Sequence, residues 1–91
     1  MVVKVKFFSA FREVFGTRER DYVIPDGARA RALIEAMADQ PERRAALLRG
    51  SNLHPHLVLL VGGEALSSRG GLEAELRDGD VLAVFPMLGG G

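Results

Sequence analysis

The chain has no cysteine and no excess of charge of either sign. Without cysteine it can form no disulfide, no thiolate metal site and no cysteine nucleophile. Its 12 basic and 12 acidic residues cancel to a formal net charge of zero, so no overall field attracts nucleic acid or an anionic membrane. We therefore expect neither nucleic acid nor a membrane among its partners.

Long hydrophobic runs are also absent. The longest, Leu57 to Val61, is far shorter than the roughly 20 residues that a membrane-spanning helix needs, and the N-terminus lacks the pattern of a signal peptide. These absences predict a cytoplasmic protein. What is present fits one small folded domain, because 91 residues, of which 47% are hydrophobic and 26% charged, can bury a single core.

Hydrophobic periodicity predicts both strands and helices. Alternation over residues 2–8 predicts a first strand with Val3, Val5 and Phe7 on its buried face and Phe8 on the opposite, outer face. Further strands are expected at residues 22–24, 57–61, 64–66 and 81–85. The main helix is expected where apolar residues recur at helical spacing, at Ala30, Leu33, Ile34 and Met37. Residues 72–76 are expected to form a single helical turn.

Two shorter helices complete the predicted order. Ser9 is expected to cap one that Gly16 ends, and Pro41 to begin another that continues to Gly50. Residues 51–55 are expected to be loop. This order predicts an α+β fold of the β-grasp (ubiquitin-like) type: a mixed sheet of four to five strands, one main helix packed on one face and a short second helix.

The most unusual feature lies at the C-terminal end. Residues 81–91 carry no charged side chain and end in Leu88-Gly89-Gly90-Gly91. Glycines at an open end serve no fold requirement, so we interpret residues 1–86 as the β-grasp domain and residues 87–91 as a flexible tail. Such a tail can enter a narrow channel in another protein, where the Gly91 carboxylate can attack ATP to form an acyl-adenylate. The ATP would belong to that partner, since this chain has no phosphate-binding loop and is expected to bind no cofactor itself.

Three stretches of the sequence resemble one known family. They are Asp78-Gly79-Asp80-Val81-Leu82-Ala83-Val84-Phe85-Pro86 with the glycines that follow, His54 to Glu64, and Val3 to Gly16. Each is similar to the corresponding segment of the MoaD/ThiS sulfur carriers, ubiquitin-like proteins that include the small subunit of molybdopterin synthase. Gly90 and Gly91 match the family's diglycine, and Gly89 occupies the position of the small residue before it. Gly62 departs from the family, in which an Asn is frequent at this turn.

The resemblance implies a specific chemistry at Gly91. An adenylating enzyme similar to ubiquitin-activating enzymes would adenylate Gly91, and a sulfur-donating enzyme would convert it to a thiocarboxylate. As the small subunit of molybdopterin synthase, the chain would insert the Gly91 thiocarboxylate into the large subunit and give up its sulfur to form the dithiolene in molybdenum cofactor biosynthesis. Other roles stay open: sulfur transfer for thiamine, cysteine or transfer-RNA thiolation, protein conjugation as a ubiquitin-like modifier, or a β-grasp interaction module without covalent chemistry. No cluster of residues indicates an independent active site.

Strand alternation next to the tail predicts a docking surface. Leu82 and Val84 should face the core, whereas Phe85 should face outward beside the tail. An outward aromatic side chain is suited to anchor a partner protein. The residues expected to contact a partner are Phe85, Pro86, Met87, Leu88 and Gly89.

Other polar residues are interpreted as structural. His54 and His56 flank a proline without a third ligand nearby in the sequence, so no metal site is expected. Asp78 and Asp80 flank a glycine and are expected to be turn residues rather than an acid/base pair. A solvated helix face is expected for Arg43, Arg44 and Arg49.

Overall fold

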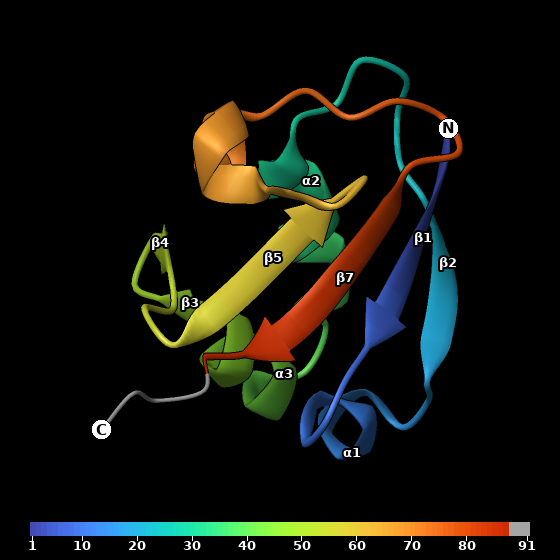
Figure 1. Ribbon diagram of the computed structural model, residues 1–91. Coiled ribbons are helices and arrows are strands. Elements are labelled where there is room, and N and C mark those ends of the chain that lie inside the picture. The colour runs from blue at the N-terminus through green and yellow to red at the C-terminus, as the bar shows by residue number, and fades with distance from the viewer. Residues whose placement is uncertain (88–91) are drawn as a thin grey trace.

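Figure 1 shows the computed structural model of the chain, which describes residues 1–87. Five strands form one mixed sheet in the order β2-β1-β7-β5-β6. The central strands β1 and β7 run parallel, and the other neighbouring pairs are antiparallel. The bounds of the strands are β1 Val2–Phe7, β2 Glu19–Val23, β5 Leu57–Val61, β6 Glu64–Ala65 and β7 Val81–Pro86.

The helices cover one face of this sheet. In Figure 1, α2 (Ala30–Met37) and α3 (Pro41–Leu47) lie behind the sheet, and α1 (Phe11–Phe15) lies at its lower end. The core residues of β1, β7 and α2 are each 2% exposed or less: Val3, Val5, Phe7, Leu82, Val84, Ala30, Leu33, Ile34 and Met37. The β-grasp prediction, with the main helix on one face, is confirmed. Within the described chain no helix covers the opposite, outer face, so side chains there remain accessible.

Several local predictions are also confirmed. Gly62 and Gly63, between β5 and β6, have φ of 58° and 80°, and two consecutive left-handed residues make the tight turn that suits the twist of a hairpin. Gly16 ends α1 in the left-handed conformation. Pro41 lies at the start of α3, where its missing N–H costs no helical hydrogen bond.

The predictions for Ser9 and for the second strand were wrong. Ser9 has φ of 54°, the residue before α1 is Ala10, and no side chain caps this helix. The left-handed turn at Ser9 redirects the chain from β1 into α1, so its hydroxyl is not placed as a cap. β2 begins at Glu19 rather than Tyr22, because its antiparallel pairing with β1 extends to Lys6↔Glu19.

The predicted end of the second short helix was also wrong. α3 stops at Leu47, and Leu48–Arg49 form a two-residue strand, β3, that pairs with β4 (Asn52–Leu53) in the expected loop. Gly50, with φ of 63°, permits this small hairpin. The local helix propensity of Leu48 and Arg49 is thus overridden by strand pairing.

Short helical segments precede β7. The 3-10 helices η1 (Leu66–Arg69) and η2 (Gly71–Glu73) replace the single turn expected at 72–76. The chain becomes extended at Ala74, whose carbonyl accepts a hydrogen bond of 2.8 Å from the N–H of Ala30. This bond satisfies a backbone donor at the start of α2, which explains why the helical turn ends there. At 8 residues, α2 is the longest helix of residues 1–87, and none of these helices is long and apolar enough to cross a membrane.

Candidate functional site

The last described residues of the chain continue a central strand of the sheet. β7 pairs with β5 as far as Leu57↔Pro86, and the N–H of Met87 then donates a hydrogen bond of 2.7 Å to the carbonyl of His56. Pro86 was expected to stop the strand but occupies its last position. Its missing N–H would point toward β1, whose pairing with β7 has already ended at Phe7↔Val84, so no ladder hydrogen bond is lost.

An aromatic pair supports this end of β7. The rings of Phe8 and Phe85 stack with centroids 4.2 Å apart and planes at 9°. The guanidinium of Arg12 lies over the Phe8 ring, 5.6 Å from its centroid, and its Nε donates to the carbonyl of Phe7 at 3.0 Å. The outward direction of Phe85 is confirmed, because its neighbour Val84 is fully buried. Phe85 is nevertheless half-buried, since Phe8 covers part of its ring.

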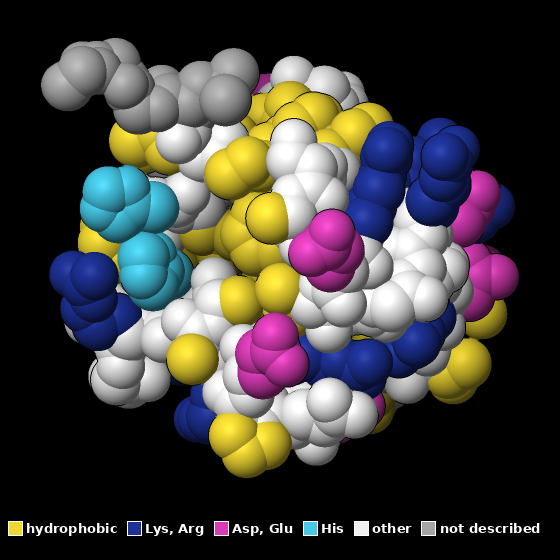
Figure 2. All heavy atoms as spheres, turned by 90° about the horizontal axis from the view of Figure 1, so that it is seen from below, with side chains coloured by type: hydrophobic (Ala, Val, Ile, Leu, Met, Phe, Trp, Pro, Cys, Tyr) yellow, Lys and Arg dark blue, Asp and Glu magenta, His cyan; other side chains and the backbone are white. Residues whose placement is uncertain are grey.

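Apolar side chains surround the stacked pair on the outer face. In the antiparallel register, Val58 lies opposite Phe85 and Leu60 lies opposite Ala83. We call Phe8, Val58, Leu60, Ala83 and Phe85 the tail-root patch; each is partly exposed. Figure 2 shows hydrophobic side chains gathered at this end of the molecule, between histidines on one side and Lys and Arg side chains on the other. A contiguous apolar surface with a polar rim is typical of a protein interface.

A shallow groove adjoins the patch at the edge of β5. β6 pairs only with Leu60 and Val61, so the edge of β5 from Leu57 to Leu59 is left without a strand partner. The groove, of about 200 Å³, is lined mainly by apolar side chains, with Met87 at one side. Met87 itself is 51% exposed. The surface around the last described residue is therefore apolar on two sides.

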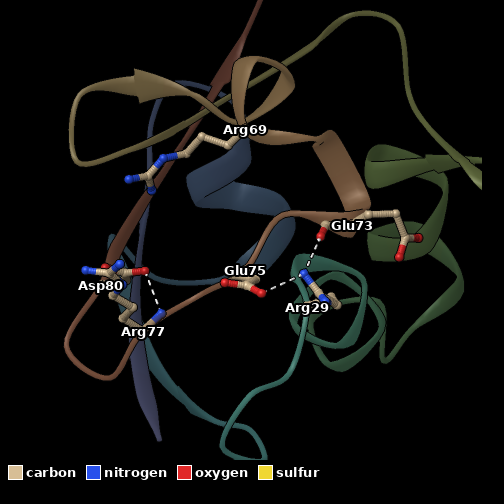
Figure 3. A pocket seen from close by; sticks show the side chains of 6 residues that line it. All are labelled: Arg29, Arg69, Glu73, Glu75, Arg77 and Asp80. Carbon is tan, nitrogen blue, oxygen red and sulfur yellow. Dashed lines mark hydrogen bonds and ion pairs between the residues drawn. The ribbon is translucent and has the colours of Figure 1, made fainter.

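A second hollow, of about 480 Å³, lies near the start of β7 and is charged. Figure 3 shows its lining residues Arg29, Arg69, Glu73, Glu75, Arg77 and Asp80. Most of its charged side chains have a partner: Arg29 pairs with Glu75 at 3.1 Å, Glu73 with Arg31 at 2.7 Å and Arg69 with Glu64 at 2.9 Å, and Asp80 accepts a hydrogen bond of 2.8 Å from the backbone N–H of Arg77. Asp78 likewise accepts from the N–H of Val2 at 2.7 Å. The turn roles predicted for Asp78 and Asp80 are confirmed.

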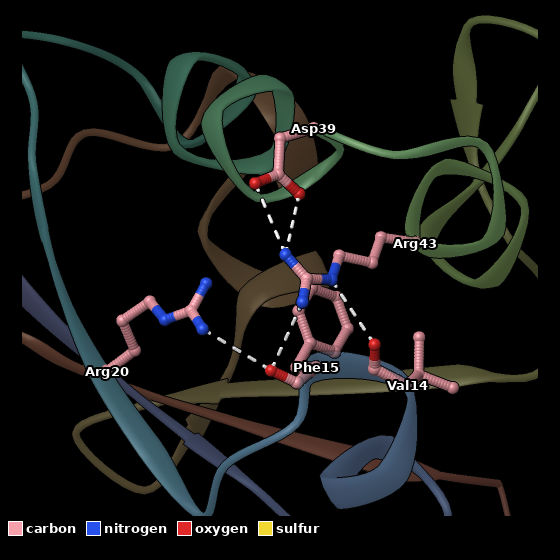
Figure 4. A network of polar contacts seen from close by, with 5 residues as sticks. All are labelled: Val14, Phe15, Arg20, Asp39 and Arg43. Atoms are coloured by element: carbon pink, nitrogen blue, oxygen red, sulfur yellow. Dashed lines mark hydrogen bonds and ion pairs between the residues drawn. The ribbon is translucent and has the colours of Figure 1, made fainter.

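Arg43 was expected on a solvated face, and this prediction was wrong. Its side chain is only 12% exposed and lies 5.5 Å over the ring of Phe15. Figure 4 shows its guanidinium group donating to the carbonyls of Val14, at 3.2 Å, and Phe15, at 3.4 Å, and to the carboxylate of Asp39. Hydrogen bonding from Arg43 lowers the pKa of Asp39. Arg43 therefore caps the C-terminal carbonyls of α1, the helix that follows Phe8 in the chain.

The two histidines lie close together beside the groove. Their ring centroids are 5.5 Å apart, and Nδ1 of His54 accepts a hydrogen bond of 3.1 Å from the N–H of His56. Within residues 1–87, no three acidic or histidine side chains are grouped so that they could hold a metal ion. The geometry at the root of the tail thus favours protein docking.

The sequence model of the ThiS family matches residues 5–91. The chain belongs to the ThiS family. It is 28% identical to small archaeal modifier protein 3 of Haloferax volcanii over the full length of both. Two solved structures are also similar. A putative molybdopterin converting factor, subunit 1, from Pyrococcus furiosus has 33% identity and a TM-score of 0.77, with 97% of this chain and 99% of that chain covered. A chain of the Amycolatopsis orientalis BexX/CysO complex has 30% identity and a TM-score of 0.77, with 98% and 99% covered.

Only part of the predicted site of this ThiS-family chain lies in the described residues. Phe85, Pro86 and Met87 are brought together at the end of β7, whereas Leu88, Gly89, Gly90 and Gly91 lie outside the described residues, and their roles stay predictions. The predicted domain boundary after Pro86 also stays a prediction. Sequence reasoning missed Phe8 and Arg12. The alternation of the first strand already assigned Phe8 to the outer face, and a parallel pairing with the last strand would have brought it to Phe85.

Proposed function

We propose that this chain is a sulfur carrier whose Gly91 carboxyl group is activated by a partner enzyme and then bears sulfur as a thiocarboxylate. ThiS-family membership makes it a sulfur carrier of the ThiS/MoaD type or a small protein modifier. One observation carries the finer proposal: a run of three glycines is separated only by Met87 and Leu88 from a strand that ends beside a partly exposed apolar patch. The patch offers a partner a place to bind, and the glycines offer a slender chain to take into its active site.

The proposed activation proceeds in two balanced steps. An oxygen of the Gly91 carboxylate attacks the α-phosphorus of ATP held by an adenylating enzyme similar to ubiquitin-activating enzymes, and pyrophosphate leaves. Hydrosulfide supplied by a sulfur-donating enzyme then attacks the acyl carbon, the bond from that carbon to the AMP oxygen breaks, and the thiocarboxylate and AMP are the products. This chain contributes the carboxyl group and the docking surface. The enzyme contributes ATP and the groups that stabilise the developing charge.

Molybdopterin synthase is the acceptor that we propose for the sulfur. The Pyrococcus furiosus relative, a putative molybdopterin converting factor subunit 1, supports this choice at 33% identity. The loaded chain would bind the large subunit through the tail-root patch and place the Gly91 thiocarboxylate in that subunit's active site. The BexX/CysO complex supports the idea that chains of this kind bind a partner protein. Thiamine, cysteine and transfer-RNA thiolation are alternative acceptors that use the same thiocarboxylate.

Protein modification is the second candidate function. The likeness to small archaeal modifier protein 3 over the full length of both chains favours it. The first step would be the same, but an amine would replace sulfur as the nucleophile, and an isopeptide bond would form. Both functions therefore depend on an activated Gly91 carboxyl group.

Intact-mass measurement tests the activation. The purified chain is incubated with an adenylating enzyme of the ubiquitin-activating type, ATP and a sulfur donor, and its mass is expected to rise by about 16 Da as sulfur replaces oxygen. An unchanged mass, with an enzyme that loads another ThiS-family chain in parallel, would contradict the proposal and favour a non-covalent β-grasp module. Adding the loaded chain to a molybdopterin synthase large subunit and its pterin precursor then tests the acceptor. Sulfur should leave the chain only when both are present.

A further inference from the structure

Amines are scarce on this protein. Of its 12 basic residues, ten are arginines and only two, Lys4 and Lys6, are lysines. A guanidinium stays protonated in proteins and does not attack acyl groups, whereas a lysine amine does so once it has lost its proton. Most of the basic side chains therefore cannot be acylated, and the two side-chain amines that can be acylated lie on a single strand.

Both lysines project from the outer face of β1, and their surroundings differ. Nζ of Lys4 lies 3.3 Å from a carboxylate oxygen of Glu19, and its side chain is 45% exposed. Asp21 also lies opposite Lys4 in the register with β2. Attack by Lys4 on an acyl group requires that its contact with Glu19 be broken. The cross-strand neighbour of Lys6 on β2 is Glu19, but that carboxylate contacts Lys4. Lys6 is exposed and forms no ion pair with any residue of 1–87, so its amine can be approached directly.

Lys6 lies at the border of the tail-root patch. It is the cross-strand neighbour of Ala83 in the parallel pairing of β1 with β7, and Phe8 follows on the same face. When a copy of the chain is bound to its activating enzyme through this patch, the enzyme covers the surroundings of that copy's own Lys6. The lysine that meets the activated carboxyl group is then one on a second copy, whose outer face is uncovered.

We propose that Lys6 is the acceptor site for self-conjugation, in which Gly91 of one copy is joined to the side-chain amine of Lys6 in another. The inference rests on the proposed activation of Gly91. The unprotonated Nζ of Lys6 attacks the acyl carbon of the Gly91 adenylate, a C–N bond forms, and the bond from that carbon to the AMP oxygen breaks. AMP leaves with the electron pair, and the extra proton on the nitrogen passes to water. The product is an isopeptide-linked pair of chains.

The experiment separates donor from acceptor. The donor is the unlabelled wild-type chain with the adenylating enzyme and ATP, and no sulfur donor is added. The acceptor is ¹⁵N-labelled chain that lacks residues 89–91 and so has no glycine terminus of the kind proposed to be activated. It is prepared with the wild-type lysines, with Lys4→Arg or with Lys6→Arg. Exchange of radioactive pyrophosphate into ATP reports activation of the donor, and intact mass reports a pair that contains one labelled and one unlabelled chain.

The mixed pair is expected with the wild-type and Lys4→Arg acceptors and should be lost with Lys6→Arg. Tryptic peptides of the pair should carry the branch at Lys6. Equal melting temperatures of the two variants would establish that the loss is chemical. The inference would be overturned, and the proposed activation left intact, if the mixed pair persisted with Lys6→Arg or if its branch lay at another amine. The same would follow if the donor cyclised with loss of one water, or if pyrophosphate exchange occurred without formation of any mixed pair. Absence of exchange would overturn both proposals.

Discussion

Phe8 and Phe85 stack face to face with ring centroids 4.2 Å apart, although Phe8 follows the first strand of the fold and Phe85 lies one residue before the end of the last. The parallel pairing of β1 with β7 makes this contact possible, because it aligns the C-terminal ends of both strands. The N–H of Phe8 also donates to the carbonyl of Val84 at 3.1 Å. The end of β7 is therefore held against the chain segment that leads into α1.

The stacked pair should make a measurable contribution to stability. In a double-mutant cycle with Phe8→Ala and Phe85→Ala, we expect a coupling of about 0.5–1.5 kcal/mol in the free energy of unfolding. Urea denaturation of the four proteins measures it. If the effects of the two substitutions on the free energy of unfolding were strictly additive, contact between the two rings would contribute nothing to stability.

Phe85 should matter more for partner binding than for folding. Phe85→Ala is expected to weaken binding to the activating enzyme by about 2 kcal/mol, which is roughly 30-fold, if Phe85 is an interface anchor. Val23→Ala is the matched control, because Val23 is 80% exposed on the outer face of the edge strand β2. Calorimetric titration with the enzyme compares the two variants. Equal affinities of the two variants for the enzyme would show that the tail-root patch is not part of the interface.

The global fold could be predicted because its signals extend over whole elements. The alternation of Val3, Val5 and Phe7 and the helical stripe ending at Met37 each specify a buried face, and both faces are found in the core. The stack of Phe8 on Phe85 could not be derived in this way. Alternation assigns a residue to a face, whereas strand order and register decide which residue on that face becomes its neighbour.

Arg43 illustrates a second limit of sequence reasoning. Its position on a short polar helix predicted solvent exposure, and nothing local indicated that α3 would pack its Arg43 against the end of α1. The hairpin of β3 and β4 was missed for a similar reason, since Leu48 and Arg49 suit a helix as well as a strand. Tertiary hydrogen bonds decide both cases, with the carbonyls of Val14 and Phe15 as acceptors in one and the β3–β4 pairing in the other.

Arg43 should contribute more to stability than its neighbour Arg44. Arg43→Ala leaves the Val14 carbonyl without its charged donor and the Phe15 carbonyl with Arg20 alone, and it is expected to cost about 2 kcal/mol. Arg44→Ala, the matched control, removes a solvent-exposed ion pair of 2.9 Å with Glu35 and should cost less than Arg43→Ala. Thermal and urea unfolding of both variants gives the comparison. An equal loss would mean that the capping bonds of Arg43 contribute no more than a solvated ion pair.

The contact of Asp39 with Arg43 should make stability dependent on pH in the acid range. Because the hydrogen bond from Arg43 lowers the pKa of Asp39 in the folded state, its contribution is present above the ordinary Asp value of about 3.9 and is lost as pH falls through the folded pKa. The difference in melting temperature between wild type and Asp39→Asn should therefore shrink as the pH is lowered from 7 toward the folded pKa and below it.

The wild-type profile also contains Glu35, whose pKa is lowered by its hydrogen bond from Arg44. Taking the difference between wild type and Asp39→Asn removes this shared contribution. A second series with Glu35→Gln checks that the two carboxylates act independently. A difference for Asp39→Asn that stayed constant across the acid range would show that ionisation of Asp39 does not stabilise the fold.

Gly91 should be required for loading and dispensable for folding. Deletion of Gly91 removes the carboxyl group from the position at which it is proposed to be activated, so the mass increase on incubation with enzyme, ATP and sulfur donor should disappear. Gly91→Ala keeps the chain length and should load more slowly, because a Cβ must then enter a channel built for glycine. Both variants are expected to melt within about 2 °C of wild type, since residues 1–87 form a buried hydrophobic core. If the deleted chain were still loaded at the wild-type rate, activation would have to occur at a carboxyl group other than that of Gly91.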